Sequence, residues 1–466
     1  MLPMAVRMMN DEITIDPWGS SQSTDYSRII DKFGLSSMES VSVDSPSKLH
    51  RRGVIFAHRD LDMVLEAKRK GDSFGVLTGL MPSGKMHLGH SMVIDQVKWF
   101  QQQGGDVTIA VADLESNATR GISLSEGKKI AKEEYVAYYA ALGLDPEKTT
   151  VYFQSQRSVV QRLGFQLGKR TNLSELEAIY GFDGATNLAH VQAPLVQAGD
   201  ILHPQLDEFG GLRPIVVPVG IDQDPHLRLT RGLAAKTNWF NVSDAKMGLQ
   251  VGVSVQEDNA AVMGLEPSGR VNKEVRKGVF SRIVDSISSL GYSDIMSNPK
   301  HGTVNVPSAT SKDKGAIRMS LLSLEREMGG MGLLAPSSTY HRFAVGMTGD
   351  KMSSSKPKTT LFLGDDISAA EKKIKKSFSG GQSTVEEHRR LGGDPNKDVA
   401  YQYMMYFFEE DDSFLEEINQ GYRSGQILAG EMKQLCIDRA TEWLSELSEK
   451  RDETAHLIDR FFEGSR

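Results

Sequence analysis

The sequence contains a single cysteine, Cys436, among 466 residues. One thiol excludes an internal disulfide and any zinc site built on several thiolates, so Cys436 is interpreted as a buried core residue. No run approaches the roughly 18 consecutive apolar residues that a membrane-spanning helix needs. The first residues reach acidic and polar side chains too early for a signal peptide. These features predict a protein without membrane spans that stays in the cytoplasm.

The sequence also has no excess of basic residues, because its formal net charge is −7. It therefore predicts no general attraction to a nucleic-acid backbone. The distribution is uneven, however, and lysines gather between positions 351 and 376 with few acids among them. Such a cluster indicates either a binding patch or a solvated helix face. With 39% hydrophobic and 25% charged residues, the chain can bury a large core in several domains.

Short β-rich runs alternate with helical patterns in the first half of the chain. The runs are FGVLT (74–78), VTIAVA (107–112), TVYF (150–153) and PIVVPV (214–219). This alternation predicts βαβ units on a parallel sheet. After about residue 378 the apolar residues keep a helical spacing, which predicts a separate all-helical domain.

The segment PSGKMHLGH (82–90) follows the first of these runs. His87 and His90 stand at the expected N-terminus of a helix, where free N–H groups and the helix dipole favour a phosphate. Gly89 has no side chain and would let a flat ring such as adenine lie against the backbone. Taken alone, the two histidines could equally be surface residues.

The segment KMSSSK (351–356) supplies a second candidate phosphate site. Lys351 is expected to act as a movable positive charge on a leaving pyrophosphate, and the adjacent serines offer hydroxyl and backbone donors. A polar loop or a phosphorylation site is the alternative. A third segment, VGIDQDPH (219–226), begins where a predicted strand ends, at the sheet edge where ligands bind. Asp222 and Gln223 could hold an ammonium group or ribose hydroxyls, although Asp222 or Asp224 could instead cap a helix.

The motifs HLGH and KMSSS, in this order, resemble the two signatures of class I aminoacyl-tRNA synthetases. The segments TIDPWGSSQSTDYSRIIDKFG, RRGVIFAHRDLDMVL, VGIDQDPHLRLTR and FSGGQSTVEEHRRLGGDPNKDVAYQYMMYFFEEDD are similar to archaeal and eukaryotic tryptophanyl-tRNA synthetases. The resemblance covers nearly the whole chain except 241–335. It implies a tryptophan–tRNA ligase with ATP and Mg²⁺, the partners tRNA(Trp) and L-tryptophan, and a homodimer. The catalytic residues it implies are His87, His90 and Lys351, and the ATP contacts are Pro82, Gly84, His87, Gly89, His90, Lys351, Met352, Ser353, Ser354 and Ser355.

The residues that read the amino acid depart from this family. Eukaryotic-type members place a Tyr and a Gln on the indole nitrogen, but Leu77 and Ala110 stand at the matching positions. The segment QAGDIL (197–202) instead resembles bacterial tryptophan enzymes, in which an aspartate accepts the indole N–H. We therefore expect Asp200 to bind the indole, because a buried carboxylate is a strong acceptor. Its alternative is a helix-end or salt-bridged aspartate.

The same aspartate position reads the phenol in tyrosyl-tRNA synthetases, which usually add a Tyr where Leu77 stands. Because Leu77 leaves an apolar wall, it favours an indole over a phenol. Gln197, Gln223 and Glu115 match family residues that hold the ammonium group. A core glutamine is the alternative for Gln197, and surface exposure is the alternative for Glu115.

The predicted organisation is an α/β protein with a Rossmann-like parallel-sheet catalytic domain, an inserted subdomain and a C-terminal all-helical anticodon-binding domain. Its parts are an N-terminal extension (1–68), the catalytic domain with HLGH (69–240), the inserted subdomain (241–335), the KMSSS loop that ends the catalytic domain (336–378) and the helical domain (379–466). The inserted stretches VRKGVFSRIVDSISSLGY and AIRMSLLSLEREMGGMGLL are expected to be helical. Two other functions stay open: a tyrosine enzyme, and a non-catalytic synthetase-like module that binds RNA.

Overall fold

A seven-stranded sheet forms the centre of the computed structural model, which describes residues 26–465. Its order is β1 (Ser36–Ser37), β2 (Ile55–Arg59), β11 (Ser337–His341), β6 (Ile215–Gly220), β3 (Gly75–Leu80), β4 (Asp106–Val111) and β5 (Thr149–Phe153). The strands from β11 to β5 run parallel, β2 pairs antiparallel with β11, and the edge strand β1 pairs antiparallel with β2. Because β3 lies between β4 and β6, the loop after β3 opens near the middle of the sheet edge where ligands bind.

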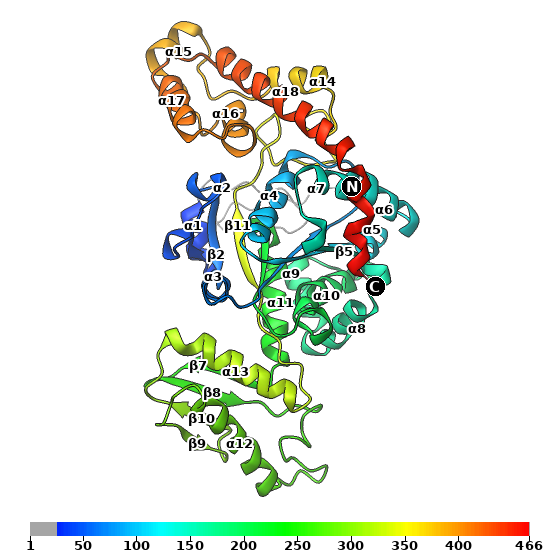
Figure 1. Cartoon of the computed structure of the whole chain (residues 1–466), viewed down its shortest axis with the longest axis vertical. Coiled ribbons are helices and arrows are strands. Elements are labelled where there is room, and N and C mark those ends of the chain that lie inside the picture. The colour runs from blue at the N-terminus through cyan, green and yellow to red at the C-terminus, as the bar shows by residue number, and fades with distance from the viewer. Residues whose placement is uncertain (1–25, 466) are drawn as a thin grey trace.

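Helices cover the sheet, as the alternation of patterns predicts (Figure 1). They are α1 (Tyr26–Phe33), α2 (Lys48–Arg51), α3 (Leu61–Lys70), α4 (Leu88–Gln102), α5 (Asp113–Arg120), α6 (Leu124–Ile130), α7 (Ala137–Ala141), α8 (Ser158–Leu167), α9 (Leu173–Tyr180), α10 (Leu188–Leu202) and α11 (Asp224–Thr237). The Rossmann-like α/β prediction is confirmed. None of the helices within residues 26–465 combines the length and apolarity needed to span a bilayer.

The inserted stretch forms a small α+β unit with its own core. An antiparallel sheet of order β7 (Phe240–Asp244), β8 (Leu249–Val253), β10 (Thr303–Val306) and β9 (Met296–Asn298) packs against α12 (Lys273–Ser288) and α13 (Lys314–Glu327). The two helices were predicted, whereas the sheet was not. In Figure 1 this unit and the C-terminal helices lie at opposite ends of the molecule.

The C-terminal part is helical throughout, as predicted. Beyond residue 378 it contains α15 (Val385–Leu391), α16 (Val399–Tyr403), a π-helical segment (Met404–Phe408), α17 (Asp412–Arg423) and α18 (Ala429–Glu453). The helix α14 (Ile367–Lys375) comes before the predicted boundary and packs against α18. Cys436 is fully buried on α18, in agreement with its interpretation as a core residue.

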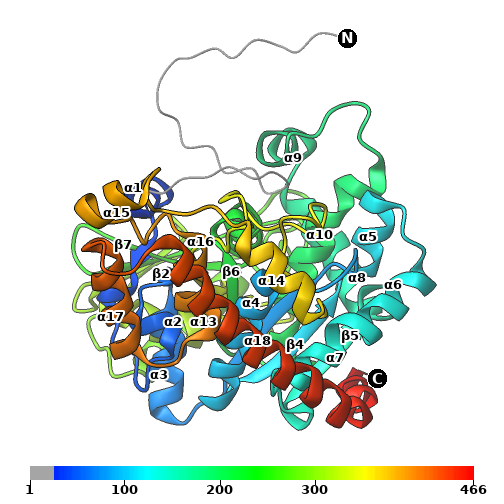
Figure 2. The same cartoon turned by 90° about the horizontal axis from the view of Figure 1, so that it is seen from above.

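The end of the chain returns to the edge of the central sheet (Figures 1 and 2). A 3₁₀ segment (Ala455–Ser465) lies along β5, and the ring of Phe462 stacks on that of Phe153 with centroids 5.3 Å apart. The helical part is thereby attached to the α/β part at β5. Residues 1–25 of the expected N-terminal extension lie outside the described residues.

Candidate active site

The two histidines of HLGH lie at the start of α4. The His87 amide donates a hydrogen bond to Nδ1 of His90 (3.1 Å), and the two imidazole rings stack with centroids 3.8 Å apart. Because Nδ1 of His90 accepts this bond, the proton of a neutral His90 ring is on Nε2. That nitrogen is therefore a hydrogen-bond donor.

Both imidazoles are held in the neutral form. Burial lowers the pKa of His90 to about 4. The pKa of His87 is lowered well below its usual value by burial, with smaller contributions from His90 and Lys351. Near neutral pH this pair therefore offers N–H donors, and Lys351 supplies the positive charge of the site.

Gly89 contacts the His87 ring. A Cβ atom at Gly89 would lie 3.0 Å from Cε1 of His87 and 3.5 Å from Cβ of Ala344, so the glycine leaves room for the imidazole over the helix start. The ring thus lies against the glycine face that the sequence had suggested for adenine.

Backbone pairing brings residues 361–363, which follow the KMSSS segment, against the HLGH turn. Leu88 donates its N–H to the carbonyl of Leu361 (3.2 Å), and Leu363 donates to the carbonyl of Met86 (3.0 Å). The Ser354 hydroxyl also donates to the carbonyl of Lys85 (3.5 Å). Segments that are far apart in sequence therefore lie side by side, and a pocket opens between them next to the HLGH histidines' turn. It is lined by Lys85, Ser354, Pro357, Phe362, Asp365 and Lys373.

Lys351, which the sequence predicts to be catalytic, contacts Asp222 in the third segment, VGIDQDPH. Nζ of Lys351 lies 2.9 Å from Oδ2 of Asp222, and Gln223 donates to the same oxygen (3.0 Å). The Lys351 side chain is about a quarter exposed. Asp222 makes no cap with its side chain, so the capping alternative for this residue is wrong. HLGH, KMSSS and IDQD thus meet at one end of the parallel strands.

Asp200 lies in a buried polar cluster between α10 and β5. One of its oxygens accepts from the Tyr152 hydroxyl (2.5 Å) and the other from Nε2 of Gln154 (2.5 Å). The Arg157 guanidinium stacks on the Tyr152 ring, with its central carbon 4.5 Å from the ring centroid. Burial raises the pKa of Asp200 to about 7 in spite of these two donors.

Apolar side chains border this cluster. Leu77 is buried and packs with Ile201, Ile215, Val217 and Leu227. Ala110 pairs in register with Tyr152 on the neighbouring strand, and both belong to one small cluster. A small residue at position 110 leaves room for the tyrosine ring beside it. The family's Tyr and Gln are thus absent from β3 and β4, while a Tyr and a Gln reach Asp200 from β5 and the turn that follows it.

The proposed ammonium-binding residues lie on neighbouring helices. Glu115 on α5 and Gln197 on α10 are both half-buried, and these two helices pack together. The Glu115 carboxylate makes no hydrogen bond within residues 26–465, and burial raises its pKa to about 7. Glu115 is thus half-buried and not fully exposed as the surface alternative supposed, and its charge also raises the pKa of Asp200.

Sequence reasoning missed the residues that orient these groups. Tyr152 and Gln154 had no recognisable motif, although Tyr152 was inside a predicted strand. Asp224 was considered only as a helix cap, whereas it is fully buried and accepts from the Tyr340 hydroxyl (2.6 Å) and from Nε of Arg59 (3.1 Å). Asp224 thereby attaches the start of α11 to β2 and β11.

Comparison with known proteins agrees with this geometry. The family described as tRNA synthetases class I (W and Y) matches residues 69–269 and 318–445. The chain is 39% identical to the tryptophan–tRNA ligase of Methanosarcina acetivorans, over 96% of this chain and 98% of that protein. It is 40% identical to that of Thermoplasma acidophilum, over 96% of this chain and 99% of that protein. The chain belongs to the tryptophan–tRNA ligases, within the class I tRNA synthetases.

A solved structure supports the same family assignment. The crystal structure of tryptophanyl-tRNA synthetase from Aeropyrum pernix K1 superposes with a TM-score of 0.70 at 35% identity, covering 96% of this chain and 98% of that one. The expected family and fold are therefore confirmed, and members of this family are ATP-using aminoacyl-tRNA ligases. The family match omits residues 270–317, which hold most of the inserted α+β unit.

Proposed function

We propose that this protein activates L-tryptophan with ATP and transfers it to tRNA(Trp). The observation that carries the proposal is the backbone pairing of residues 361–363, just after KMSSS, with residues 86–88, which brings the two candidate phosphate-binding motifs close together. Family membership indicates the same activity.

In the first step, a carboxylate oxygen of tryptophan attacks the α-phosphorus of ATP. The bond from that phosphorus to the bridging oxygen of the β-phosphate breaks, which gives tryptophanyl-adenylate and pyrophosphate. In the second step, a hydroxyl of the terminal ribose of tRNA attacks the carbonyl carbon of the adenylate, and AMP leaves. Neither step needs a protein nucleophile, so the protein mainly positions the reactants and stabilises charge.

The ATP end is assigned to the two loops that pair. The neutral rings of His87 and His90 donate hydrogen bonds to phosphate oxygens, and Lys351 leaves Asp222 to meet the departing pyrophosphate. The remaining proposed contacts supply backbone and hydroxyl donors: Gly84, Gly89, Met352, Ser353, Ser354 and Ser355. Pro82 has no N–H to donate, and its role is to shape the turn.

The amino-acid end is assigned to buried groups. Asp200 accepts the indole N–H, and Leu77 forms part of the apolar wall. Glu115, Gln197, Asp222 and Gln223 hold the ammonium group, since Glu115 carries no other hydrogen-bonding partner in the described part of the chain.

Magnesium is proposed to arrive with ATP. No three His, Cys, Asp or Glu side chains within residues 26–465 come together as a metal site. Mg²⁺ keeps several of its waters and is commonly bound through substrate phosphates. We therefore assign it no protein ligand and attribute no step to a protein-bound ion.

The domain division predicted from the sequence is retained as a proposal. Residues 69–240 and 336–378 form the catalytic domain, 1–68 the N-terminal extension, 241–335 the inserted subdomain and 379–466 the anticodon-binding domain. The protein is proposed to act in the cytoplasm, where translation proceeds. Single-stranded RNA loops are read through stacking and polar base edges.

The role of the inserted subdomain can be tested by deleting residues 241–335 and measuring adenylate formation separately from tRNA charging. The result shows whether the insertion serves the acceptor arm, supports the active site or is dispensable.

A homodimer is also part of the proposal. Phe165 on α8 is 81% exposed and Leu188 at the start of α10 is 78% exposed, and these two helices pack together. Large exposed apolar side chains are typical of surfaces that another chain covers. Phe165→Glu is expected to convert a dimer to a monomer in light scattering, whereas a wild-type monomer would contradict the proposal.

The test of the function is ATP–pyrophosphate exchange with each of the twenty amino acids. Exchange that depends on tryptophan supports the proposal, and exchange with tyrosine instead would favour the tyrosine enzyme. If no amino acid supports exchange, the chain is a binding module.

A further inference from the structure

The helical part of the chain directly contacts the stem of the KMSSS loop, by which we mean the backbone hairpin of residues 344–352. The Tyr403 hydroxyl, at the end of α16, donates a hydrogen bond to the carbonyl of Val345 (2.7 Å). Tyr403 is 1% exposed, so this hydroxyl is satisfied by the loop and not by solvent. A buried hydroxyl that loses its partner is costly, and the contact therefore fixes the two segments relative to each other.

Val345 is the residue that pairs with the catalytic lysine. Val345 and Lys351 form an antiparallel bridge, which is flanked by hydrogen bonds from Gly346 to Asp350 (2.6 Å) and from Met352 to Ala344 (2.9 Å). The backbone of the lysine is thus one hydrogen-bonded step from the carbonyl that Tyr403 holds.

A second connection runs from α16 to the same stem through the backbone. Val399, at the start of α16, donates to the carbonyl of Phe378 (3.2 Å), and Phe378 donates to the carbonyl of Met347 (2.6 Å). The stem is therefore held at two points by one short helix.

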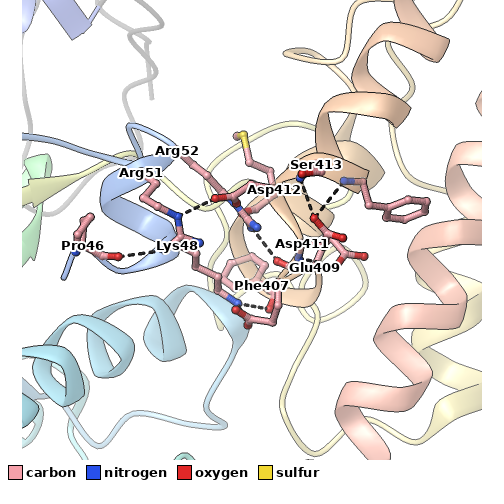
Figure 3. A network of polar contacts seen from close by, with 12 residues as sticks. Pro46, Lys48, Arg51, Arg52, Phe407, Glu409, Asp411, Asp412 and Ser413 are labelled. Carbon is pink, nitrogen blue, oxygen red and sulfur yellow. Dashed lines mark hydrogen bonds and ion pairs between the residues drawn. The ribbon is translucent and has the colours of Figure 1, made fainter.

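The π-helical segment that continues α16 is held by the N-terminal part of the chain (Figure 3). Nη1 of Arg52 donates to the carbonyls of Met405 (2.7 Å) and Glu409 (2.8 Å), while Nζ of Lys48 donates to that of Phe407 (2.8 Å). These carbonyls belong to the π-helical segment and the residue that follows it, and cations stabilise the unpaired carbonyls at a helix C-terminus.

Asp412 completes this contact by accepting from Nε of Arg52 (2.7 Å) and from Nε of Arg51 (2.6 Å). Since α2 leads directly into β2, the helical part is fixed to the central sheet on one side and to the KMSSS stem on the other. π-Helical segments are rare and frequently lie at functional sites.

We propose that Tyr403 is a positioning residue for Lys351, and that through its hydrogen bond to Val345 the helical domain controls how the KMSSS loop presents this lysine to ATP. The inference rests on the proposed function, because it assigns Lys351 to the activation step. Tyr403 does not touch the substrates in this role.

The test compares Tyr403→Phe with Tyr401→Phe in the full-length protein. Both tyrosines are buried on α16 and each uses its hydroxyl in one hydrogen bond, but that of Tyr401 goes to Asn419, outside the loop. Tyr403→Phe is expected to lower kcat for tryptophan-dependent exchange about three- to tenfold and leave KM for tryptophan unchanged. Tyr401→Phe is expected to leave both constants unchanged. Equal rates in the two variants would overturn the proposal.

Two further readouts separate positioning from a general loss of stability. In a Lys351→Ala background, Tyr403→Phe is expected to cause no further loss of exchange, whereas independent effects would multiply. Trypsin is expected to cut after Lys358 faster in Tyr403→Phe than in Tyr401→Phe, because the loop is less firmly held. The proposal would be contradicted if the losses of exchange in Lys351→Ala and Tyr403→Phe multiply in the double variant and trypsin cuts Tyr403→Phe and Tyr401→Phe at equal rates. Absence of exchange in the wild-type protein would instead refute the proposed function.

Discussion

The phosphate end of the proposed site and its amino-acid end consist of different kinds of chemical groups. The phosphate end uses backbone pairing, neutral imidazoles and one partly exposed lysine on a loop. The amino-acid end uses carboxylates whose pKa values are raised to about 7 by burial, with hydrogen bonds from side chains on separate elements. In the proposed assignment, the nucleotide is bound by a lysine on a loop that moves, whereas the amino acid is bound by groups that are already in place.

Replacing the mobile charge should have the largest effect. Lys351→Ala is expected to reduce kcat for exchange about 100-fold or more, since the group stabilises charge that develops only in the transition state. KM for tryptophan should change little. Steady-state exchange kinetics provide the measurement, with Lys356→Ala as the control in the same loop, because that side chain is about half exposed. Exchange at an unchanged rate in Lys351→Ala would refute the assigned role.

Changing the fixed group should alter binding and not kcat. Asp200→Asn is expected to raise KM for tryptophan roughly 10- to 100-fold, the range for losing a hydrogen bond to a charged acceptor. KM for ATP should stay as it is. Asp207→Asn serves as control, because Asp207 is exposed and pairs with Arg326. Equal losses in both KM values would show that the two ends are not separate.

The contrast between the two ends also explains what the sequence could predict. Each of the motifs HLGH and KMSSS is a continuous stretch of sequence, so its backbone geometry is encoded locally. Only the contact between the two motifs depends on the fold. Tyr152 and Gln154 reach Asp200 only after β5 and α10 come together, and nothing near either residue in the sequence indicates this.

The same reasoning applies to the strands. The apolar runs predicted as strands agree with β3, β4, β5 and β6 to within about two residues, because apolar runs bounded by turns predict buried strands. The strand β11 (Ser337–His341) was missed, since its SSTYH sequence is polar although all of it is buried. Its hydroxyls are satisfied by distant partners, such as Ser337 by the carbonyl of Asp60 (2.7 Å). The two short strands β9 (MSN) and β10 (TVNV) of the inserted unit were missed as well, because neither contains a longer apolar run.

The amino-acid end should be sensitive to pH where the phosphate end is not. Because burial raises the pKa of Asp200 to about 7, its indole-accepting form is lost as pH falls below that value. KM for tryptophan is expected to rise about fivefold between pH 7 and pH 6, whereas KM for ATP stays nearly constant, since the pKa of His90 is about 4. Asp200 and Glu115 interact, so the observed transition belongs to the pair. A pH-independent KM for tryptophan would contradict the assignment.

Thermal unfolding provides the control for this pH dependence. A carboxyl with a raised pKa binds a proton in the folded protein at pH values where the unfolded chain has released it. The stability it contributes is therefore greatest below its usual pKa of 3.8 and declines as pH rises toward 7. Asp200→Asn removes this decline, so its Tm relative to wild type should be higher at pH 8 than at pH 5.

The smallest effect is expected from a residue that only orients the fixed group. Tyr152→Phe keeps the ring under Arg157 and removes the hydrogen bond to Asp200. KM for tryptophan should rise about three- to tenfold, less than in Asp200→Asn, because Gln154 still holds the other oxygen. The loss of a donor to the carboxylate should also raise the pKa of Asp200 further, and the rise in KM should begin at a higher pH. A KM profile that matches wild type would mean that the packing of α10 alone places Asp200, without help from β5.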